Sequence, residues 1–173
     1  MKPISWLQFT WDLSALSSVV LDLPEHYQIV PATPEDEKEL RKVISSSFAL
    51  DPNWNPSMQE VMQTIEPWLE RAGETATSTC LVLRHGSRII GASVLSLDAN
   101  AENHLAPGPC MLIEYRNRGF GTNLLARSLG ALRDAGLVSA RAIAKENSPA
   151  SKFLYTKFNS TLAPRETGAA LAA

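Results

Sequence analysis

Large apolar side chains recur every three or four positions in the segment after Thr33, which is the spacing of one face of a helix. These residues are Leu40, Val43, Ile44 and Phe48. Thr33 and Pro34 suit the cap and the first position of a helix, and Asp36 completes a capping-box pattern. The pattern predicts a helix that buries this face, preceded by a strand over 27–30.

Two runs rich in β-branched residues, 79–83 and 88–97, flank a turn at 85–87 and predict a β-hairpin. Residues 98–108 then have the composition of a loop. Pro107 and Pro109 interrupt the hydrogen-bonding pattern of the next strand, which should be splayed rather than regularly paired.

The next part of the chain predicts two strands and two helices. A strand over 110–113 leads through a turn into a helix that ends at Gly136. The buried face of this helix consists of Leu124, Leu125, Leu129 and Leu132. A strand over 137–144 follows, and Ser148 and Pro149 suit the start of a last helix. The buried side of that helix would consist of Phe153, Leu154 and Phe158.

The two remaining segments are less regular. Residues 1–25 are an N-terminal extension in which one or two edge strands are expected. Another helix is expected over 55–69, with a kink or an early end at Pro67. The elements together predict one α/β domain of the α+β type over 26–173, with a mixed, mostly antiparallel twisted sheet and about four flanking helices.

Composition narrows the function classes. Lysine and arginine total 16 against 18 acidic residues, which gives a net charge of -2. The surface therefore lacks the overall positive potential that general nucleic-acid binding needs. The two cysteines cannot form a disulfide framework, and no Cys/His spacing indicates a metal site, so a reducing cytoplasm is expected. We expect neither a signal peptide nor a membrane span, because no apolar run is long enough.

The segment 114–122 carries the strongest chemical signal, because it joins a predicted strand to a predicted helix. Gly119 and Gly121 would let successive backbone N–H groups converge on one point, and the helix that follows adds its positive end. Such a turn can hold a pyrophosphate. The alternative is an ordinary strand-to-helix turn with two surface arginines.

Two other phosphate-binding loops do not match this segment. A P-loop needs Lys followed by Ser or Thr after its last glycine, whereas Thr122 and Asn123 stand there. A dinucleotide-binding turn needs a third small residue where Leu124 stands.

The segment resembles the coenzyme A loop of the GCN5-related N-acetyltransferase family, which has the pattern Gln/Arg-x-x-Gly-x-Gly/Ala at a strand-to-helix junction. Arg116, Gly119 and Gly121 match this pattern. Residues 110–115 are similar to the family's fourth strand, and 145–155 to its last conserved block. The resemblance implies an acyltransferase that moves the acetyl group of acetyl-coenzyme A, its co-substrate, to a primary amine by direct attack in a ternary complex.

The resemblance also implies roles for single residues. Arg116 would be one of the cofactor-binding residues. The pyrophosphate would be bound by the backbone N–H groups of Asn117, Arg118, Gly119, Phe120, Gly121 and Thr122. Pro109, Cys110 and Met111 would pair with the pantetheine arm, and the Met111 N–H would stabilise the oxyanion. Asn147 would contact the cofactor arm.

In the same family, the residue matched by Tyr155 protonates the departing thiolate, and the alternative is a tyrosine that only packs. Tyr155 lies eight residues after Asn147, whereas the commoner family spacing is seven, which would place Leu154 there. We expect the extra residue to be absorbed in the turn before Pro149.

The acceptor amine must lose a proton, and Glu102 and His104 are the candidates for the base. If a strand begins by 102, both side chains share one face near the cleft. The alternatives are a solvated carboxylate and a surface histidine. A nucleophilic role for Cys110 is disfavoured, because no histidine lies nearby in the sequence to activate it.

Residues 161–173 are too few and too rich in alanine for the two final strands usual in the family, so the C-terminal part is expected to be incomplete. The N-terminal extension could supply a replacement strand, or a homodimer could cover the open edge. A coenzyme A-binding sensor or scaffold without catalysis therefore stays open as a second function. The acceptor, a small molecule or a protein amine, has no diagnostic motif.

Overall fold

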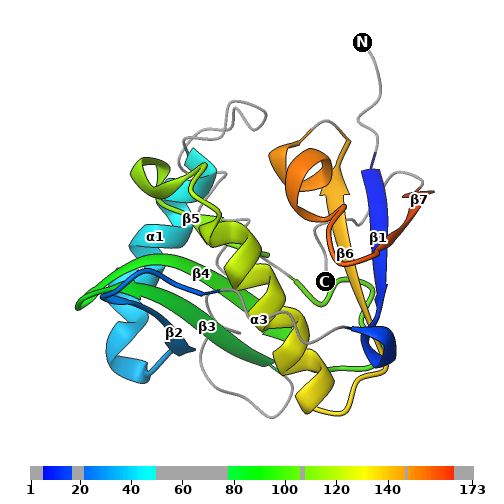
Figure 1. The fold of residues 1–173 in the computed structure, drawn as a ribbon, viewed down its shortest axis with the longest axis horizontal. Helices are drawn as coiled ribbons and strands as arrows, with labels where there is room; N and C mark the ends of the chain where they lie inside the picture. The colour runs from blue at the N-terminus through cyan, green and yellow to red at the C-terminus, as the bar shows by residue number, and fades with distance from the viewer. Residues whose placement is uncertain (1–5, 17–21, 50–77, 106–107, 147, 166–173) are drawn as a thin grey trace.

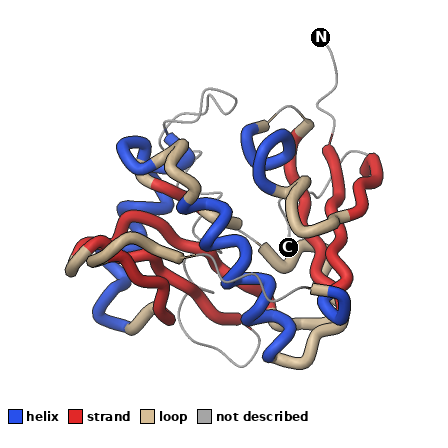
Figure 2. Tube along the Cα trace, in the orientation of Figure 1, coloured by secondary structure: helices blue, strands red, loops and turns tan. Residues whose placement is uncertain are grey.

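The computed structural model describes residues 6–16, 22–49, 78–105, 108–146 and 148–165. Its strands form two sheets, in the orders β2-β3-β4-β5 and β6-β1-β7, which Figures 1 and 2 show from the same side. Every strand pair in these sheets is antiparallel. The combination of antiparallel sheets with flanking helices confirms the predicted fold class. The helix predicted over 55–69 lies outside the described residues.

The larger sheet contains the predicted hairpin and carries a helix on each face. Its strands are β2 (Tyr27–Pro31), β3 (Ser78–His85), β4 (Arg88–Ser96) and the short β5 (Cys110–Met111). Helix α1 (Glu37–Ala49) packs on one face and α3 (Phe120–Asp134) on the other (Figure 1). The apolar faces predicted for both helices are buried where the side chains are described, and Phe48 lies outside that description.

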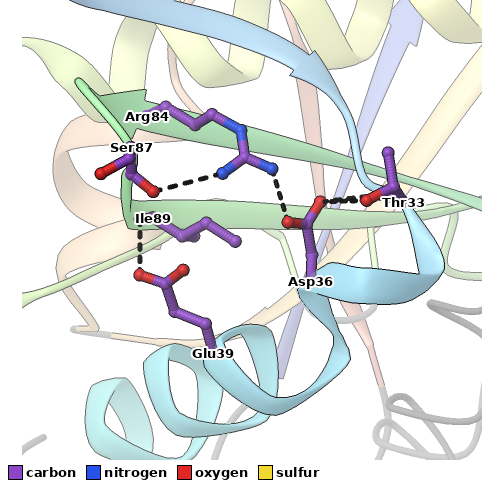
Figure 3. Close-up of polar contacts among 6 residues, drawn as sticks. All are labelled: Thr33, Asp36, Glu39, Arg84, Ser87 and Ile89. Atoms are coloured by element: carbon purple, nitrogen blue, oxygen red, sulfur yellow. Dashed lines mark hydrogen bonds and ion pairs between the residues drawn. The ribbon is translucent and has the colours of Figure 1, made fainter.

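A capping network starts α1 and ties it to the hairpin (Figure 3). The Asp36 carboxylate accepts hydrogen bonds from the Thr33 N–H and hydroxyl at 2.8 and 3.1 Å, and it pairs with Arg84 at 2.6 Å. Glu39 accepts the Ile89 N–H at 2.9 Å. Burial raises the pKa of Asp36, but the hydrogen bonds from Thr33 and Arg84 outweigh it and hold that pKa below its ordinary value.

In the smaller sheet, β1 (Trp6–Asp12) lies between β6 (Ser139–Lys145) and β7 (Thr161–Arg165). The N-terminal extension thus supplies an inner strand, so the prediction of an edge strand is wrong. Burial of Phe9 and Trp11, at 1% and 0% exposure, favours the inner position. The composition of the tail did not predict β7, which backbone pairing with β1 holds in place.

The two sheets meet at His104. Its backbone N–H donates to the Arg141 carbonyl on β6 at 2.7 Å, and its carbonyl accepts the Ser96 N–H from the end of β4 at 2.9 Å. Further along the chain, β5 pairs with β4 and belongs to a different sheet from β6. The prediction of a splayed strand after the prolines is therefore confirmed.

The last predicted helix is only a π-helical turn, η4 (Ala150–Leu154). The Tyr155 N–H donates to the Ala150 carbonyl at 2.8 Å. Phe153, which the sequence places on the buried side, is 72% exposed, and Tyr155 faces inward instead. Leu154 and Phe158 are partly buried against the core as predicted, so Phe153 alone is misplaced. The wider π turn changes which side chains face the core, and α-helical spacing therefore does not predict the inward position of Tyr155.

Short 3-10 turns occur at Leu13–Ala15, Pro34–Asp36 and Ile113–Tyr115. No helix within the described ranges is long and apolar enough to cross a membrane.

Candidate functional site

The turn between β5 and α3 presents a row of backbone N–H groups at the start of a helix. Asn117 and Gly119 have positive φ angles of 64° and 84°, and Gly119 caps α3. The first hydrogen bond of the helix runs from the Asn123 N–H to the Gly119 carbonyl at 3.2 Å. Among the described residues, the N–H groups of 117–119 donate to no backbone carbonyl outside the helices and strands. Those of 120–122 lie in the first turn of α3, where a helix offers no backbone partner. Together with the positive end of α3, they can bind an anion.

Gly121, in the first turn of α3, leaves open space beside these groups. The nearest described atom to a β-carbon at Gly121 would be the Leu154 Cδ1, at an ordinary contact distance of 3.8 Å. The fold therefore does not require glycine at this position, whereas the positive φ of Gly119 does favour it. A missing side chain here lets a phosphate approach the backbone closely.

Strand β5 has one edge paired and the other directed to where the sheets diverge. The Leu112 N–H donates to the Ile90 carbonyl on β4 at 2.9 Å. Because N–H groups alternate along a strand, the Met111 N–H points away from β4. This edge, to which Pro109 and Cys110 lead, can pair with an extended ligand.

Arg116 braces the loop from within the protein. Its Nε donates to the Met111 carbonyl at 3.3 Å, and its Nη2 donates to the Ser47 carbonyl in α1 at 3.1 Å. The guanidinium thus ties the start of the loop to both β5 and α1. The exposed Arg118 instead lies over the Tyr115 ring, 5.4 Å from its centroid.

The Tyr155 hydroxyl reaches the entrance of β5. The ring is 4% exposed and packs edge-on against Phe9 and Trp11 of β1, with centroids 5.5 and 5.7 Å away. The hydroxyl lies against Gly108. Burial raises the pKa of Tyr155 above its ordinary value, so the hydroxyl keeps its proton at neutral pH. This is the protonation state that a proton donor needs.

The π turn bears on the long spacing before Tyr155. A π turn holds one residue more than an α turn, so η4 can accommodate an extra residue before Tyr155. Asn147, from which the spacing is counted, lies outside the described residues, so the absorption of the extra residue before Pro149 stays a prediction. The Trp11 indole N–H donates to the Lys157 carbonyl at 2.8 Å and fixes the chain just after the tyrosine. Leu154, the residue at the commoner spacing, faces Gly121 instead.

The two candidate bases lie in different surroundings, so the prediction that they share one face is wrong. Glu102 is exposed, whereas His104 is fully buried. The His104 Nδ1 accepts the Arg141 N–H at 2.9 Å, and its Nε2 lies 2.9 Å from the Asp98 carbonyl. These partners select the neutral tautomer with the proton on Nε2. Burial also lowers the pKa of His104, which favours the neutral ring. The ring thus has a structural role, holding backbone groups together where the two sheets meet.

Both cysteines have the chemistry of packing residues. Burial raises the pKa of Cys80 to about 12 and that of Cys110 to about 11. The Cys110 thiol donates to the Gly108 carbonyl at 3.2 Å. Thiols that stay protonated at neutral pH are poor nucleophiles, which disfavours a covalent acetyl-enzyme.

Three residues of this site are not indicated by the sequence. Phe9 and Trp11 come from the N-terminal strand, and no local pattern connects them with Tyr155. Gly108 lies between two prolines that signal a splayed strand but not a contact with a tyrosine. Asn147, predicted to contact the cofactor arm, lies outside the described residues.

A model of the acetyltransferase (GNAT) family matches residues 38–159. A GCN5-related N-acetyltransferase structure from Sphaerobacter thermophilus is 15% identical, with a TM-score of 0.63, over 94% of this chain and 50% of that chain. PaiA N-acetyltransferase from Thermoplasma acidophilum, in complex with coenzyme A, is 18% identical over 64% of this chain and 74% of that one, with a TM-score of 0.51.

A GNAT family acetyltransferase from Brucella melitensis, in complex with acetyl-CoA, is 24% identical over 65% of this chain and 71% of that one, with a TM-score of 0.50. At these identities, the structural likeness shows a shared fold. The chain spans about half the length of several structures that it matches, including the one from Sphaerobacter thermophilus. No curated protein matches the sequence.

Proposed function

This chain belongs to the acetyltransferase (GNAT) family, and we propose that it transfers the acetyl group of acetyl-coenzyme A to a primary amine. The observation that carries this proposal is the row of N–H groups at residues 117–122, which directly follows the open edge of β5. A ligand that joins a pyrophosphate to an amide-containing arm would use both features at once. Acetyl-coenzyme A has this construction and would be the co-substrate.

Two further observations support a fit to coenzyme A. Gly121 leaves room at the N–H groups that a pyrophosphate would approach. The structures from Thermoplasma acidophilum and Brucella melitensis are complexes with coenzyme A and acetyl-CoA, respectively. The pantetheine arm would extend along Pro109, Cys110 and Met111.

The proposed chemistry is direct attack in a ternary complex. The amine nitrogen attacks the thioester carbonyl carbon, and the Met111 N–H would donate a hydrogen bond to the oxygen as it gains negative charge. The carbon–sulfur bond then breaks, and the Tyr155 hydroxyl would protonate the leaving sulfur. The amine gives up one proton to a base or to water, and Tyr155 regains one from water, so the proton balance closes.

The amine needs a base, directly or through water. Both ring nitrogens of His104 lie at hydrogen-bond distance from backbone groups, so we favour Glu102 or a water molecule. The acceptor is proposed to be the primary amine of a small molecule or of a protein.

Thermal unfolding with and without acetyl-coenzyme A tests the binding step. A ligand at about 100 times its Kd stabilises the folded state by about 2.7 kcal/mol, which should raise the Tm by about 5–10 °C. NAD serves as the control and should leave the Tm unchanged. Equal stabilisation by NAD, or none by acetyl-coenzyme A, would refute the assignment of the loop.

A second candidate function is coenzyme A binding without catalysis, as a sensor or scaffold. The engaged ring nitrogens of His104 favour it, because they leave the site without that base. Release of the coenzyme A thiol, measured with a panel of primary amines, separates the two functions. Thiol release that depends on an amine supports the transferase, whereas binding without any turnover supports the sensor.

A further inference from the structure

Four aromatic side chains form a cluster between the proposed coenzyme A loop, residues 116–119, and the β3–β4 hairpin. The cluster consists of Tyr27 at the start of β2, His85 at the end of β3, Tyr115 before the loop and Phe120 at the start of α3. These four residues, which we call the aromatic brace, come from segments far apart in the sequence. None of their side chains has a role in the chemistry proposed above.

The members of the brace are in direct contact. The Tyr27 ring stacks on His85, with centroids 4.3 Å apart and an interplanar angle of 1°, and it also stacks on Phe120 at 4.7 Å. The His85 Nδ1 lies 2.9 Å from the Tyr115 hydroxyl. Both ends of the loop, Tyr115 and Phe120, are therefore attached to one pair of rings.

The hairpin side of the brace is held firmly. Arg84, next to His85, is paired with Asp36, and Glu39 accepts the Ile89 N–H just after the turn (Figure 3). The Gly86 N–H donates to the His26 carbonyl at 2.8 Å, which fixes the tip of the hairpin to the start of β2. Tyr27 and His85 thus stand on a part of the protein that has fixed partners.

The hairpin also reaches the loop through charged side chains. Arg88 pairs with Glu114 at 3.2 Å, and its guanidinium lies 5.8 Å from the centroid of the Tyr115 ring. Arg118 lies over the same ring. Tyr115 is therefore the point at which the hairpin and the loop converge.

The backbone between Tyr115 and Phe120 needs such support. Asn117 and Gly119 both have positive φ angles, a conformation that most residues avoid and that asparagine and glycine tolerate best. Surrounding contacts must hold a loop of this kind in place. The direction of the N–H groups at residues 117–122 depends on that conformation, and groups oriented in advance bind an anion at a smaller entropic cost.

We propose that Tyr27 and His85 are positioning residues that hold the coenzyme A loop at its two ends, through Phe120 and Tyr115, in the conformation that binds pyrophosphate. This inference rests on the proposed function. The brace acts in the absence of ligand, so it can be tested separately from ligand binding.

The experiment uses His85→Phe, Tyr115→Phe and the double variant in the full chain. His85→Phe keeps a ring to stack on Tyr27, and Tyr115→Phe keeps a ring beneath Arg118, so each change removes the same hydrogen bond. His26→Asn is the matched control, because His26 is an exposed histidine that faces Glu25 and has a positive φ that asparagine tolerates.

The first readout is the conformation of the loop without ligand. Trypsin cuts after arginine, and Arg116 and Arg118 lie within the loop. Cleavage there, relative to cleavage after Arg41 in α1, should become at least about threefold faster in each single variant, because a loop that opens more often is cut more often. The His26→Asn control should match the wild type.

The second readout is the Kd for coenzyme A, measured by calorimetry, and the steady-state kinetics. Each single variant should bind coenzyme A about three- to tenfold more weakly, the effect of one hydrogen bond. The KM for acetyl-coenzyme A should rise with it, while kcat stays within about twofold, because the change removes binding and not chemistry. The double variant should be no worse than either single one, since all lack the same bond.

Unchanged cleavage in both single variants would overturn the inference, and so would faster cleavage with a Kd within about twofold of wild type. A wild-type chain that binds no coenzyme A would refute the proposed function instead. In that case, faster cleavage in the variants would still support the brace as the support of the loop.

Discussion

The hydroxyl of Tyr155 occupies the space that a β-carbon on Gly108 would fill. Gly108 leads into β5, the strand that diverges from β6, while Tyr155 follows the π turn and is packed against β1. Because Gly108 has no side chain, the protonated hydroxyl of Tyr155 can lie at the start of β5, the strand along which the thioester arm would lie.

Gly108→Ala should displace the Tyr155 hydroxyl and slow acetyl transfer. A misplacement of about 1 Å can cost up to about 10²-fold in rate, so a loss of about 10- to 100-fold in the single-turnover rate is expected. In a Tyr155→Phe background the oxygen is already gone, and the same change should have much less effect. Rate losses that simply multiply in the double variant would argue against this relationship.

Tyr155→Phe should lower the maximal rate by about 10²- to 10⁴-fold, the usual contribution of general acid catalysis, with little change in coenzyme A affinity. Single-turnover transfer measured across pH is the appropriate test. Because burial raises the pKa of Tyr155, its hydroxyl stays protonated through the pH at which an ordinary tyrosine ionises. The wild-type rate should therefore show no decline below about pH 10 due to Tyr155. A variant rate within about twofold of wild type at every pH would leave Tyr155 a packing residue.

Gly121→Val should abolish coenzyme A binding, with at least a 100-fold rise in Kd, equivalent to about 2.7 kcal/mol. The side chain would fill the space at the N–H groups of the loop, while a β-carbon at this position makes only an ordinary contact with Leu154. Gly130→Val is the control, because Gly130 lies later in α3 and a β-carbon there meets no described atom within 4 Å. Both variants should keep their free energy of unfolding within about 1 kcal/mol, since valine is a slightly better helix former than glycine. Equal affinity in the two variants would refute the pyrophosphate assignment.

His104 should make the protein less stable in mild acid. Burial lowers its pKa in the folded state, and Arg141 nearby adds to this, whereas the unfolded chain binds a proton near the ordinary value of about 6.5. Contacts with the Asp98 carbonyl and the Arg141 N–H oppose this shift without reversing it. The unfolded state thus binds more protons below about pH 6.5, so stability is complete above that pH and is lost as the pH falls through it.

Urea unfolding between pH 5 and 8 measures this effect, which one proton limits to about 1.4 kcal/mol per pH unit. His104→Asn removes the titrating group, so its stability should depend less on pH in this range, whatever its absolute stability. Identical pH slopes for the two proteins would show that His104 does not titrate on unfolding.

The elements that were confirmed are those whose signals are local. Leu40, Val43 and Ile44 repeat at helical spacing, and the turn at 85–87 separates two β-branched runs, so neighbours in the chain were sufficient to define α1 and the hairpin. The motif from Arg116 to Gly121 is local too, and it led to the family that a model over 38–159 identifies. The roles of its residues in binding remain predictions.

The sequence by itself determined where α1, α3 and the hairpin lie and which family the chain belongs to, because these depend on spacing within a few residues. Tertiary structure decided that β1 enters between β6 and β7, that both His104 nitrogens face backbone groups and that Tyr155 meets Gly108. Each of these joins segments far apart in the chain. Pairing between distant segments depends on which buried surfaces and backbone edges fit together. The spacing of residues within one segment does not predict that fit.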